Sequence, residues 1–284
     1  MTAFIEIIKT IVYGIVEGIT EWLPISSTGH LILLEEILPL SVSEEFFEMF
    51  EVVIQLGASL AVLGLFLKTL LPKFRNCGVG GFLRCRENIK VWTLWSKIIV
   101  AVIPSAVIGL LFDDWFDAHF YNAGTVASTL ALYGFLYIIV ESARRGKQES
   151  IGTVHDISYG KAFGMGCFQV LALIPGTSRS GSTILGGLFL GLSRGAAAEM
   201  SFFLALPTML GASALKALKF FLEGGEMGWM EIAILLVGCV VSYLVSVIAI
   251  RFLMDFVKKH TFIPFGIYRI ALSVLVLIYF FLIK

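Results

Sequence analysis

Charged residues are scarce in this 284-residue chain. Asp, Glu, Lys and Arg together make up 15% of it, whereas soluble domains usually contain about 25%. Hydrophobic residues make up 58%, and the mean hydropathy is +0.91. The acidic and basic residues balance at a formal net charge of +0, so no overall positive field exists to attract nucleic acid. The composition excludes a nucleic-acid-binding protein and predicts an all-α integral membrane protein.

Cysteine is also rare. The four cysteines are Cys77, Cys85, Cys167 and Cys239, and no two of them form a C-x-x-C pair. This spacing excludes the usual zinc-binding patterns and gives no basis for a disulfide framework. We expect the four side chains to serve as small apolar filler.

Long apolar runs dominate what is present. Six of them approach the ~20 residues that a membrane-spanning helix needs; they lie at 50–67, 91–112, 120–140, 199–221, 232–250 and 261–283. Two further apolar regions, 10–34 and 162–193, are broken at Pro24 and at Pro175-Gly176. Short helical pieces on either side of such a break are typical of re-entrant hairpins. The pattern predicts six transmembrane helices and two re-entrant helical hairpins.

The segments between the runs alternate in charge. Basic residues concentrate in 68–97, 141–161 and 251–259, and acidic residues in 35–51, 113–119 and 223–231. Because basic loops tend to stay in the cytoplasm, the acidic segments and both termini are expected outside. Lys216 and Lys219 depart from this pattern, since they lie near the proposed outer end of their helix.

The two halves of the chain share short motifs in the same order. Residues 24–28 (PISST) resemble 175–179 (PGTSR), LGAS occurs at 56–59 and at 210–213, and IP at 103–104 and at 263–264. We therefore expect a single membrane domain over 1–284, built from a first repeat, 1–142, and a second, 160–284. Each repeat holds one hairpin and three spans. The odd number of spans inverts the second repeat, so that the two hairpin tips can meet near the midplane.

The first break, EGITEWLPISSTGH, contains Glu17 and Glu21 four residues apart, so they share one face of a helix. Two neighbouring carboxylates in a membrane are costly and repel each other. A divalent cation such as Mg²⁺ or Ca²⁺ relieves both problems, because hard cations prefer oxygen ligands. The alternative is a water-exposed glutamate pair near the outer interface.

After Pro24, the residues Ser26, Ser27 and Thr28 open the next helix, with His30 in its first turn. Hydroxyls at a helix start often only cap it, but the free N–H groups there also attract phosphate. Serine beside a histidine that titrates near neutral pH is the pairing used in nucleophilic displacement. A structural histidine and simple caps are the alternative.

The second break, PGTSRSGST, carries Arg179, the one charged residue between positions 162 and 193. Its guanidinium suits two phosphate oxygens at once, and the glycines around it allow close approach to an anion. The alternative is a structural Arg179–Glu21 pair that joins the hairpins, and the two are compatible if the pair forms in the empty site. Carboxylates, a nucleophile and an anion clamp together predict phosphoryl transfer on a substrate with a lipid tail.

Both breaks resemble the two signature motifs of the undecaprenyl-diphosphatase family, of the bacitracin-resistance type. The resemblance extends over essentially the whole chain, including LALP at 204–207 and YRI at 268–270. It implies removal of the terminal phosphate from undecaprenyl diphosphate, which recycles the cell-wall lipid carrier and confers bacitracin resistance. It also implies a divalent-cation requirement, an inverted-repeat fold and a location in the bacterial cytoplasmic (inner) membrane, with the site open to the outer, periplasmic side.

Carried onto this chain, the resemblance implies that Glu17 and Glu21 hold the metal or position the diphosphate. Ser27 becomes the preferred nucleophile, His30 its proton partner, and Arg179 the group that neutralises the diphosphate. Further hydroxyl donors to the substrate are expected around it, namely Ser26, Thr28, Thr177, Ser178, Ser180 and Thr183. Attack by His30 itself, or by water with a glutamate as base, remains open.

Two other function classes compete with the phosphatase. A lipid-carrier flippase or secondary transporter can use the same inverted-repeat fold, but it does not need a serine beside a histidine. A channel or structural protein does not need the ionisable groups at the breaks. Arg269, near the last span, is expected to be structural and to pair across helices. The sequence is compatible with a homodimer.

Overall fold

The computed structural model describes residues 2–73, 86–146 and 151–283 of the chain. Within these ranges the chain is helical, and the one β interaction is an isolated bridge between Ile151 and Leu192. Cys77 and Cys85, two of the four cysteines expected to be apolar filler, lie outside the described residues. Cys167 and Cys239 are free thiols, and Cys167 is exposed.

Six helices of the described chain are long and apolar enough to cross a membrane. They are α3 (Glu44–Leu65), α6 (Arg86–Phe120), α7 (Ala123–Ala143), α10 (Arg194–Leu222), α11 (Trp229–Val257) and α12 (Ile263–Ile278), the last continued by the π-helical turn η3 (Tyr279–Ile283). Each predicted span falls on one of them. The protein is a multi-pass membrane protein, as the sequence predicts.

Four of these helices, α3, α6, α10 and α11, are longer than the runs predicted for them. The basic segment 251–259, predicted as a loop, lies mostly within α11, which ends at Val257. The acidic segment 113–119, predicted as a loop, is the last part of α6, which ends only at Phe120. That segment contains no glycine or proline to stop the helix, and Asn122 then caps α7 by accepting a hydrogen bond from the Thr125 N–H. The predicted acidic segment 35–51 likewise contains the start of α3, which is capped by Ser43.

The two broken regions form pairs of shorter helices. The first pair is α1 (Thr2–Thr20) and α2 (Ser27–Ile37); the second is α8 (Tyr159–Val170), extended by the 3₁₀ turn η2 (Leu171–Leu173), and α9 (Arg179–Phe189). The helices stop and restart around Pro24 and Pro175, where the sequence predicts the breaks. With 11 residues each, α2 and α9 are ~17 Å long, about half of a ~30 Å hydrocarbon core.

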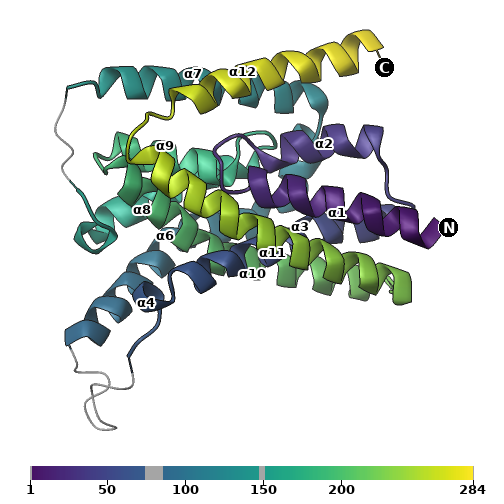
Figure 1. Ribbon diagram of the computed structural model, residues 1–284, viewed down its shortest axis with the longest axis horizontal. Coiled ribbons are helices and arrows are strands. Elements are labelled where there is room, and N and C mark those ends of the chain that lie inside the picture. The colour runs from purple at the N-terminus through teal and green to yellow at the C-terminus, as the bar shows by residue number, and fades with distance from the viewer. Residues whose placement is uncertain (1, 74–85, 147–150, 284) are drawn as a thin grey trace.

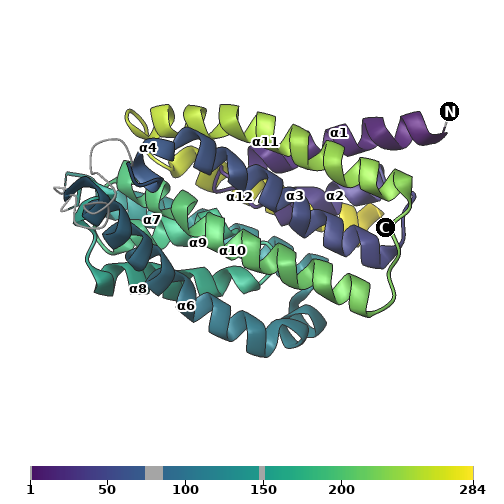
Figure 2. The same cartoon turned by 90° about the horizontal axis from the view of Figure 1, so that it is seen from below.

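The long helices pack against the two broken regions (Figures 1 and 2). Helix α12 packs along α7, α11 along both α1 and α3, α10 along α3, and α6 along α8. The chain starts at α1 and finishes beyond α12 at the same end of the molecule, while the short helix α4 (Leu67–Leu70) lies at the opposite end. The connection between α10 and α11 lies at the end of the termini (Figure 2).

Close packing at small residues holds α1 against α11. A Cβ added at Gly18 would lie 2.8 Å from both the Ser242 carbonyl oxygen and the Val245 Cβ. Gly14, one turn earlier, faces Val241 in the same way. Small residues at helix contacts let two backbones approach closely inside a membrane. These glycines therefore fix the position of α1, which carries Glu17 one turn from its end.

We predict that Gly18→Ala lowers the thermal unfolding temperature of the purified protein in detergent. The new methyl group has no space, and overpacking of this kind costs about 1–3 kcal/mol. Gly195→Ala is the matched control, because nothing lies within 4 Å of a Cβ at that helical position. An unchanged unfolding temperature in Gly18→Ala would show that α1 is not held by this contact.

Candidate functional site

The two breaks have the same local construction. Ser26 and Ser178 are the two non-glycine residues of the described chain with positive φ, at 75° and 70°. Each caps the helix that follows: the Ser26 hydroxyl accepts a hydrogen bond from the Gly29 N–H, and the Ser178 hydroxyl accepts one from the Gly181 N–H. A left-handed serine is strained, and such strain often accompanies functional sites.

A buried ion pair joins the two breaks. The Arg179 Nη2 donates to Glu21 Oε1 at 2.7 Å, and the two side chains are only 7% and 6% exposed. Ser180 adds a second link, because its hydroxyl donates to the Glu21 carbonyl oxygen at 2.8 Å. The predicted Arg179–Glu21 pair is confirmed in this structure.

Arg269, on α12, holds both breaks from a third side. Its Nη1 donates to the Pro24 carbonyl at 3.2 Å, and its Nη2 donates to the carbonyls of Gly176 and Thr177 at 2.8 and 3.0 Å. The side chain is fully buried, with its guanidinium 5.5 Å from the centre of the Tyr133 ring. Arg269 does reach across helices, but its partners are backbone carbonyls and not a carboxylate.

The second break requires a glycine next to its proline. Gly176 has φ +83°, and a Cβ there would collide with the Thr129 hydroxyl and with the Val126 backbone on α7. The same Thr129 hydroxyl donates to the Pro175 carbonyl at 2.8 Å. Helix α7 therefore supports the break directly, which only a residue without a side chain allows.

Glu21 also receives a hydrogen bond from the predicted nucleophile. The Ser27 hydroxyl donates to Glu21 Oε2 at 3.0 Å, while Oε1 holds Arg179. The sequence suggested His30 as the partner of Ser27. The hydrogen-bond acceptor that the Ser27 hydroxyl has in this structure is a carboxylate.

His30 has two other partners. Its Nδ1 lies 2.7 Å from the Ser26 carbonyl oxygen, and its Nε2 lies 2.7 Å from the Tyr268 hydroxyl. A carbonyl oxygen can only accept, so Nδ1 carries the proton and the Nε2 of the neutral ring accepts from Tyr268. The Tyr268 ring is also stacked on the imidazole, with centroids 5.7 Å apart. His30 is thus fixed in one tautomer at the start of α2.

Several polar atoms at the two breaks are buried without a hydrogen-bond partner. They include both carboxylate oxygens of Glu17, the Thr177 hydroxyl and the Arg179 Nε, and also the Trp22 Nε1 and the Nε of Arg269. A buried polar group normally has a partner, because leaving it unpaired costs about 1–3 kcal/mol. A carboxylate, a hydroxyl and a guanidinium N–H left unpaired around one ion pair indicate a site prepared for a charged ligand.

The carboxylates fit a divalent cation. Glu17 is fully buried with both oxygens unused. The Glu21 N–H donates to the Glu17 carbonyl at 3.0 Å, so the two residues are one helical turn apart. A carboxylate can accept about four hydrogen bonds or ligands, so Glu21 retains acceptor capacity beside Arg179 and Ser27. In the described ranges no three His, Cys, Asp or Glu side chains are placed so that they could hold one metal ion together, so other ligands would come from water, backbone or substrate.

A cavity of about 720 Å³ opens beside the ion pair. This volume lies in the range of small-molecule sites, ~300–1,000 Å³. The predicted site residues on its wall are Glu21, Ser27, Thr28, Ser178 and Arg179. Apolar side chains from α6, η2 and α10 form much of the rest, including Leu110, Leu173, Met209 and Leu215.

The other four predicted hydroxyl donors are not among the residues that line the cavity, and three of them are engaged elsewhere. Ser26 caps α2, and Ser180 is bonded to the Glu21 backbone. Thr183 is fully buried and lies 2.6 Å from the Ser201 hydroxyl. Thr177 is buried too, but its hydroxyl has no hydrogen-bond partner. The structure thus brings the predicted residues together at the breaks, but it places only part of them on the cavity.

The sequence analysis did not assign two groups of residues to the site. Lys216 and Lys219 of α10 line the far end of the cavity. The sequence did single out these two lysines, because they are basic residues near the proposed outer end of their helix, where the neighbouring segments are acidic. Gln169 also lines the cavity and donates to the Ser105 and Thr208 hydroxyls at 2.6 and 3.1 Å. The sequence feature that could have identified Gln169 is an amide side chain within the apolar region 162–193.

The chain is similar to known proteins over nearly its whole length. The family model described as "Bacitracin resistance protein BacA" matches residues 10–275. A protein of Desulfitobacterium hafniense (strain DSM 10664 / DCB-2) is 54% identical over 279 residues, which cover 98% of this chain and 97% of the relative. A protein of Enterococcus faecalis is 52% identical over 278 residues, 97% of both chains. One of Streptococcus suis (strain 05ZYH33) is 48% identical over 279 residues, 98% of both chains.

All three relatives bear the name undecaprenyl-diphosphatase. The family match covers both breaks and all six candidate spans almost completely. This chain is a member of the bacitracin resistance protein BacA family.

Proposed function

We propose that this protein hydrolyses undecaprenyl diphosphate to undecaprenyl phosphate and inorganic phosphate. The observation that carries the proposal is the Glu21 carboxylate, which holds Ser27 on one oxygen and Arg179 on the other at the wall of the cavity. A hydroxyl nucleophile, a carboxylate base and a guanidinium are the groups that phosphoryl transfer needs at one point. The names of the relatives supply the substrate.

Arg179 binds the diphosphate. Its Nη1 and Nη2 are held by the Ser201 carbonyl and by Glu21, and its Nε–H is unpaired. The Nε–H and the unpaired Thr177 hydroxyl can each donate to a phosphate oxygen. Lys216 and Lys219, at the other end of the cavity, add positive charge that attracts the diphosphate. The apolar wall formed by α6 and α10 accommodates the first part of the polyprenyl tail.

Ser27 is the nucleophile in this mechanism. Its hydroxyl oxygen attacks the terminal phosphorus while the hydroxyl proton passes to Glu21 Oε2, which already accepts the hydrogen bond. The new Oγ–P bond forms as the bond from phosphorus to the bridging oxygen breaks, and undecaprenyl phosphate leaves. Water then attacks the phosphoserine and releases inorganic phosphate. Arg179 neutralises charge on the transferred group throughout.

His30 takes a positioning role in this scheme. Its Nδ1–H bond to the Ser26 carbonyl braces the left-handed residue next to the nucleophile. Attack by His30 would require its Nε2 to leave the Tyr268 hydroxyl. Attack by water would use the same Glu21 oxygen as base. Attack by His30 would form a phosphohistidine, whereas attack by water would form no covalent intermediate.

Glu17 and Glu21 are the residues that would hold a divalent cation, Mg²⁺ or Ca²⁺. A bound cation would neutralise the carboxylates and the diphosphate charge. The unpaired Glu17 oxygens support this assignment.

We further propose that α1–α2 and α8–α9 are re-entrant hairpins of an inverted repeat, within one membrane domain. The matching left-handed serine caps at both breaks support it. The basic segment 68–97 begins at α4, at the end of the molecule opposite the termini (Figure 1). Because basic segments tend to stay in the cytoplasm, this placement supports termini on the outer side and a site open to the outer face of the bacterial cytoplasmic membrane. A transporter or flippase is the second candidate, but a serine bonded to a carboxylate favours bond cleavage, and the relatives named above are diphosphatases.

We predict that Ser27→Ala lowers phosphate release from a C55 diphosphate by about 10³-fold or more, because it removes the nucleophile. The exposed hydroxyl of Ser128 on α7 gives the matched control, Ser128→Ala, which retains full turnover. Acid quenching of the wild type during turnover should trap an acid-stable phosphoserine. A phosphohistidine, which survives an alkaline quench and is lost in acid, would assign the attack to His30, and wild-type turnover in Ser27→Ala would exclude Ser27.

We predict that a chelator stops phosphate release and that Mg²⁺ or Ca²⁺ restores it. In Glu17→Gln the cation concentration for half-maximal rate should rise about tenfold or more, because a neutral amide is a weaker ligand. Mn²⁺ binding followed by electron paramagnetic resonance provides a readout independent of turnover. Glu44→Gln, at an exposed helix start, is the control. Equal Mn²⁺ affinity in wild type and Glu17→Gln would remove Glu17 from the cation site.

We predict that Arg269→Gln lowers kcat/KM by about 100-fold and also lowers the unfolding temperature, because three carbonyls of the two breaks lose their donors. Arg269→Lys should be intermediate, since an ammonium group cannot reproduce the planar fork. The exposed Arg251 of α11 provides the control, Arg251→Gln. If Arg269→Gln turned over substrate normally, the breaks would not depend on this clamp.

A further inference from the structure

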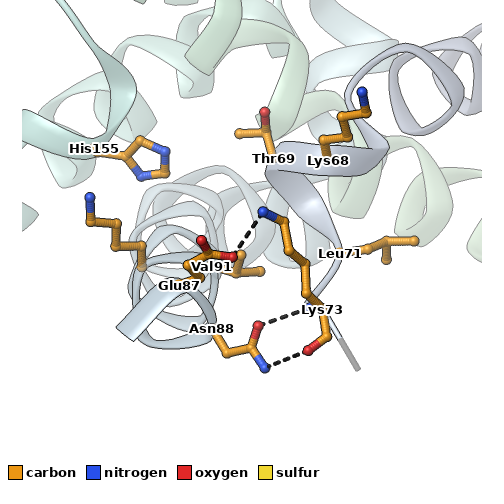
Figure 3. A pocket seen from close by; sticks show the side chains of 9 residues that line it. Lys68, Thr69, Leu71, Lys73, Glu87, Asn88, Val91 and His155 are labelled. Atoms are coloured by element: carbon orange, nitrogen blue, oxygen red, sulfur yellow. Dashed lines mark hydrogen bonds and ion pairs between the residues drawn. The ribbon is translucent and has the colours of Figure 1, made fainter. Parts of the chain in front are cut away.

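A second, smaller pocket lies at the end of the molecule opposite the termini. Its volume is about 250 Å³, and it is formed by α4, the residues just after it, the start of α6 and the 3₁₀ turn η1 (Val154–Asp156). Figure 3 shows Lys73 reaching across it to Glu87, with His155 on another side. It shares no residue with the cavity beside Arg179. The proposed reaction makes no use of it.

The pocket has a positive wall. Among the described residues that line it, Lys68, Lys73 and Lys90 face a single acid, Glu87, which pairs with Lys73 at 2.8 Å. The pKa of His155 is lowered by burial and by the positive charges of Lys90 and Lys97, an effect that Asp156 only partly opposes. A positive potential therefore remains in the pocket after the Lys73–Glu87 pair has formed.

Hydrogen bonds hold the three walls in place. Asn88 is fully buried; its Oδ1 accepts from the Lys73 N–H at 2.8 Å, and its Nδ2 donates to the Lys73 carbonyl at 3.3 Å (Figure 3). The Trp95 Nε1–H donates to the Leu70 carbonyl at 2.8 Å, and the Lys97 ammonium donates to the His155 carbonyl at 2.7 Å. The lysines are therefore gathered on a backbone that is fixed before any ligand arrives.

The surroundings match a membrane surface. Large apolar side chains next to the pocket are exposed, namely Leu67, Leu71, Ile89 and Trp92. An exposed tryptophan among lysines is typical of the interface between headgroups and hydrocarbon. The segment 68–97 is the most basic in the chain, and basic segments at this depth attract anionic lipids of the cytoplasmic leaflet.

We propose that this pocket binds a phosphate group, as carried by the headgroup of an anionic phospholipid or by free phosphate. Ammonium groups of three lysines, the Thr69 hydroxyl and the imidazole supply donors around one space. A charge-assisted hydrogen bond to phosphate is stronger than a neutral one, and occupation relieves the repulsion among the lysines. The space exceeds the ~30 Å³ of a water molecule several-fold, so a phosphate diester fits with part of its hydration.

The test measures equilibrium binding to the full-length protein in a zwitterionic detergent at constant ionic strength. The probes are short-chain phosphatidylglycerol, short-chain phosphatidylcholine and sodium phosphate. The double variant Lys68→Gln/Lys90→Gln should weaken binding of phosphatidylglycerol, of phosphate or of both about tenfold or more, because each lysine near a surface contributes appreciably to anion binding. Glu87→Gln should tighten it, because it removes the opposing charge and releases Lys73.

Lys258→Gln/Lys259→Gln is the matched control, since both residues are exposed and basic on the predicted cytoplasmic side. Free phosphate is also a product of the proposed reaction, so it can bind near Arg179 as well. The lysines of the smaller pocket are far from Arg179 in the chain and share no cavity with it, so the difference in binding between wild type and the pocket variants measures the smaller pocket alone. Lysine-dependent binding of phosphatidylglycerol but not phosphate identifies a lipid site; the reverse identifies a free-phosphate site. Equal affinity of every probe for wild type and both pocket variants overturns the proposal. Phosphate release should be unchanged in all of them, which separates this test from that of the proposed function.

Discussion

The structure depends on one buried ion pair, between Glu21 at the end of the first break and Arg179 at the start of α9. Neither charge could remain at this depth alone, because an unpaired ion in an apolar interior is costly. Removing one member of such a pair typically costs about 3–5 kcal/mol. Mutual neutralisation thus keeps two segments, 158 residues apart in sequence, in contact inside the protein.

A chain that breaks a helix inside a membrane must find partners for the freed backbone groups. Two left-handed serines cap the helices that restart, and Arg269 satisfies carbonyls of both breaks. The two arginines therefore divide the work. Both arginines leave their Nε–H unpaired. Arg269 is fully buried and donates to backbone carbonyls as a clamp, whereas Arg179 pairs with Glu21 and lines the cavity. The strained serines and the unpaired polar atoms cost folding free energy. The unpaired N–H and hydroxyl groups are the ones available to an anionic substrate.

Much of the fold could be predicted from the sequence. Apolar length identified six spans, and the prolines at 24 and 175 located both breaks, because these signals act within about 20 residues along the chain. The acidic segment 113–119 was predicted as a loop because of its charges, but it is helical. It contains no glycine or proline that would end the helix. The ion pair between Glu21 and Arg179 was predicted because a charged side chain in an apolar run needs a partner of opposite charge.

The residue types of the site were determined by the sequence alone: two glutamates one turn apart, a serine at a helix start, and a single arginine in an apolar run. The tertiary structure decided which of them touch. In the folded protein the Ser27 hydroxyl donates to Glu21 and not to His30, and His30 bonds to Tyr268. Arg269 donates to three backbone carbonyls. Hydrogen bonds have short range and strict direction, so partners that lie far apart in sequence are settled only when packed helices bring their atoms within about 3 Å.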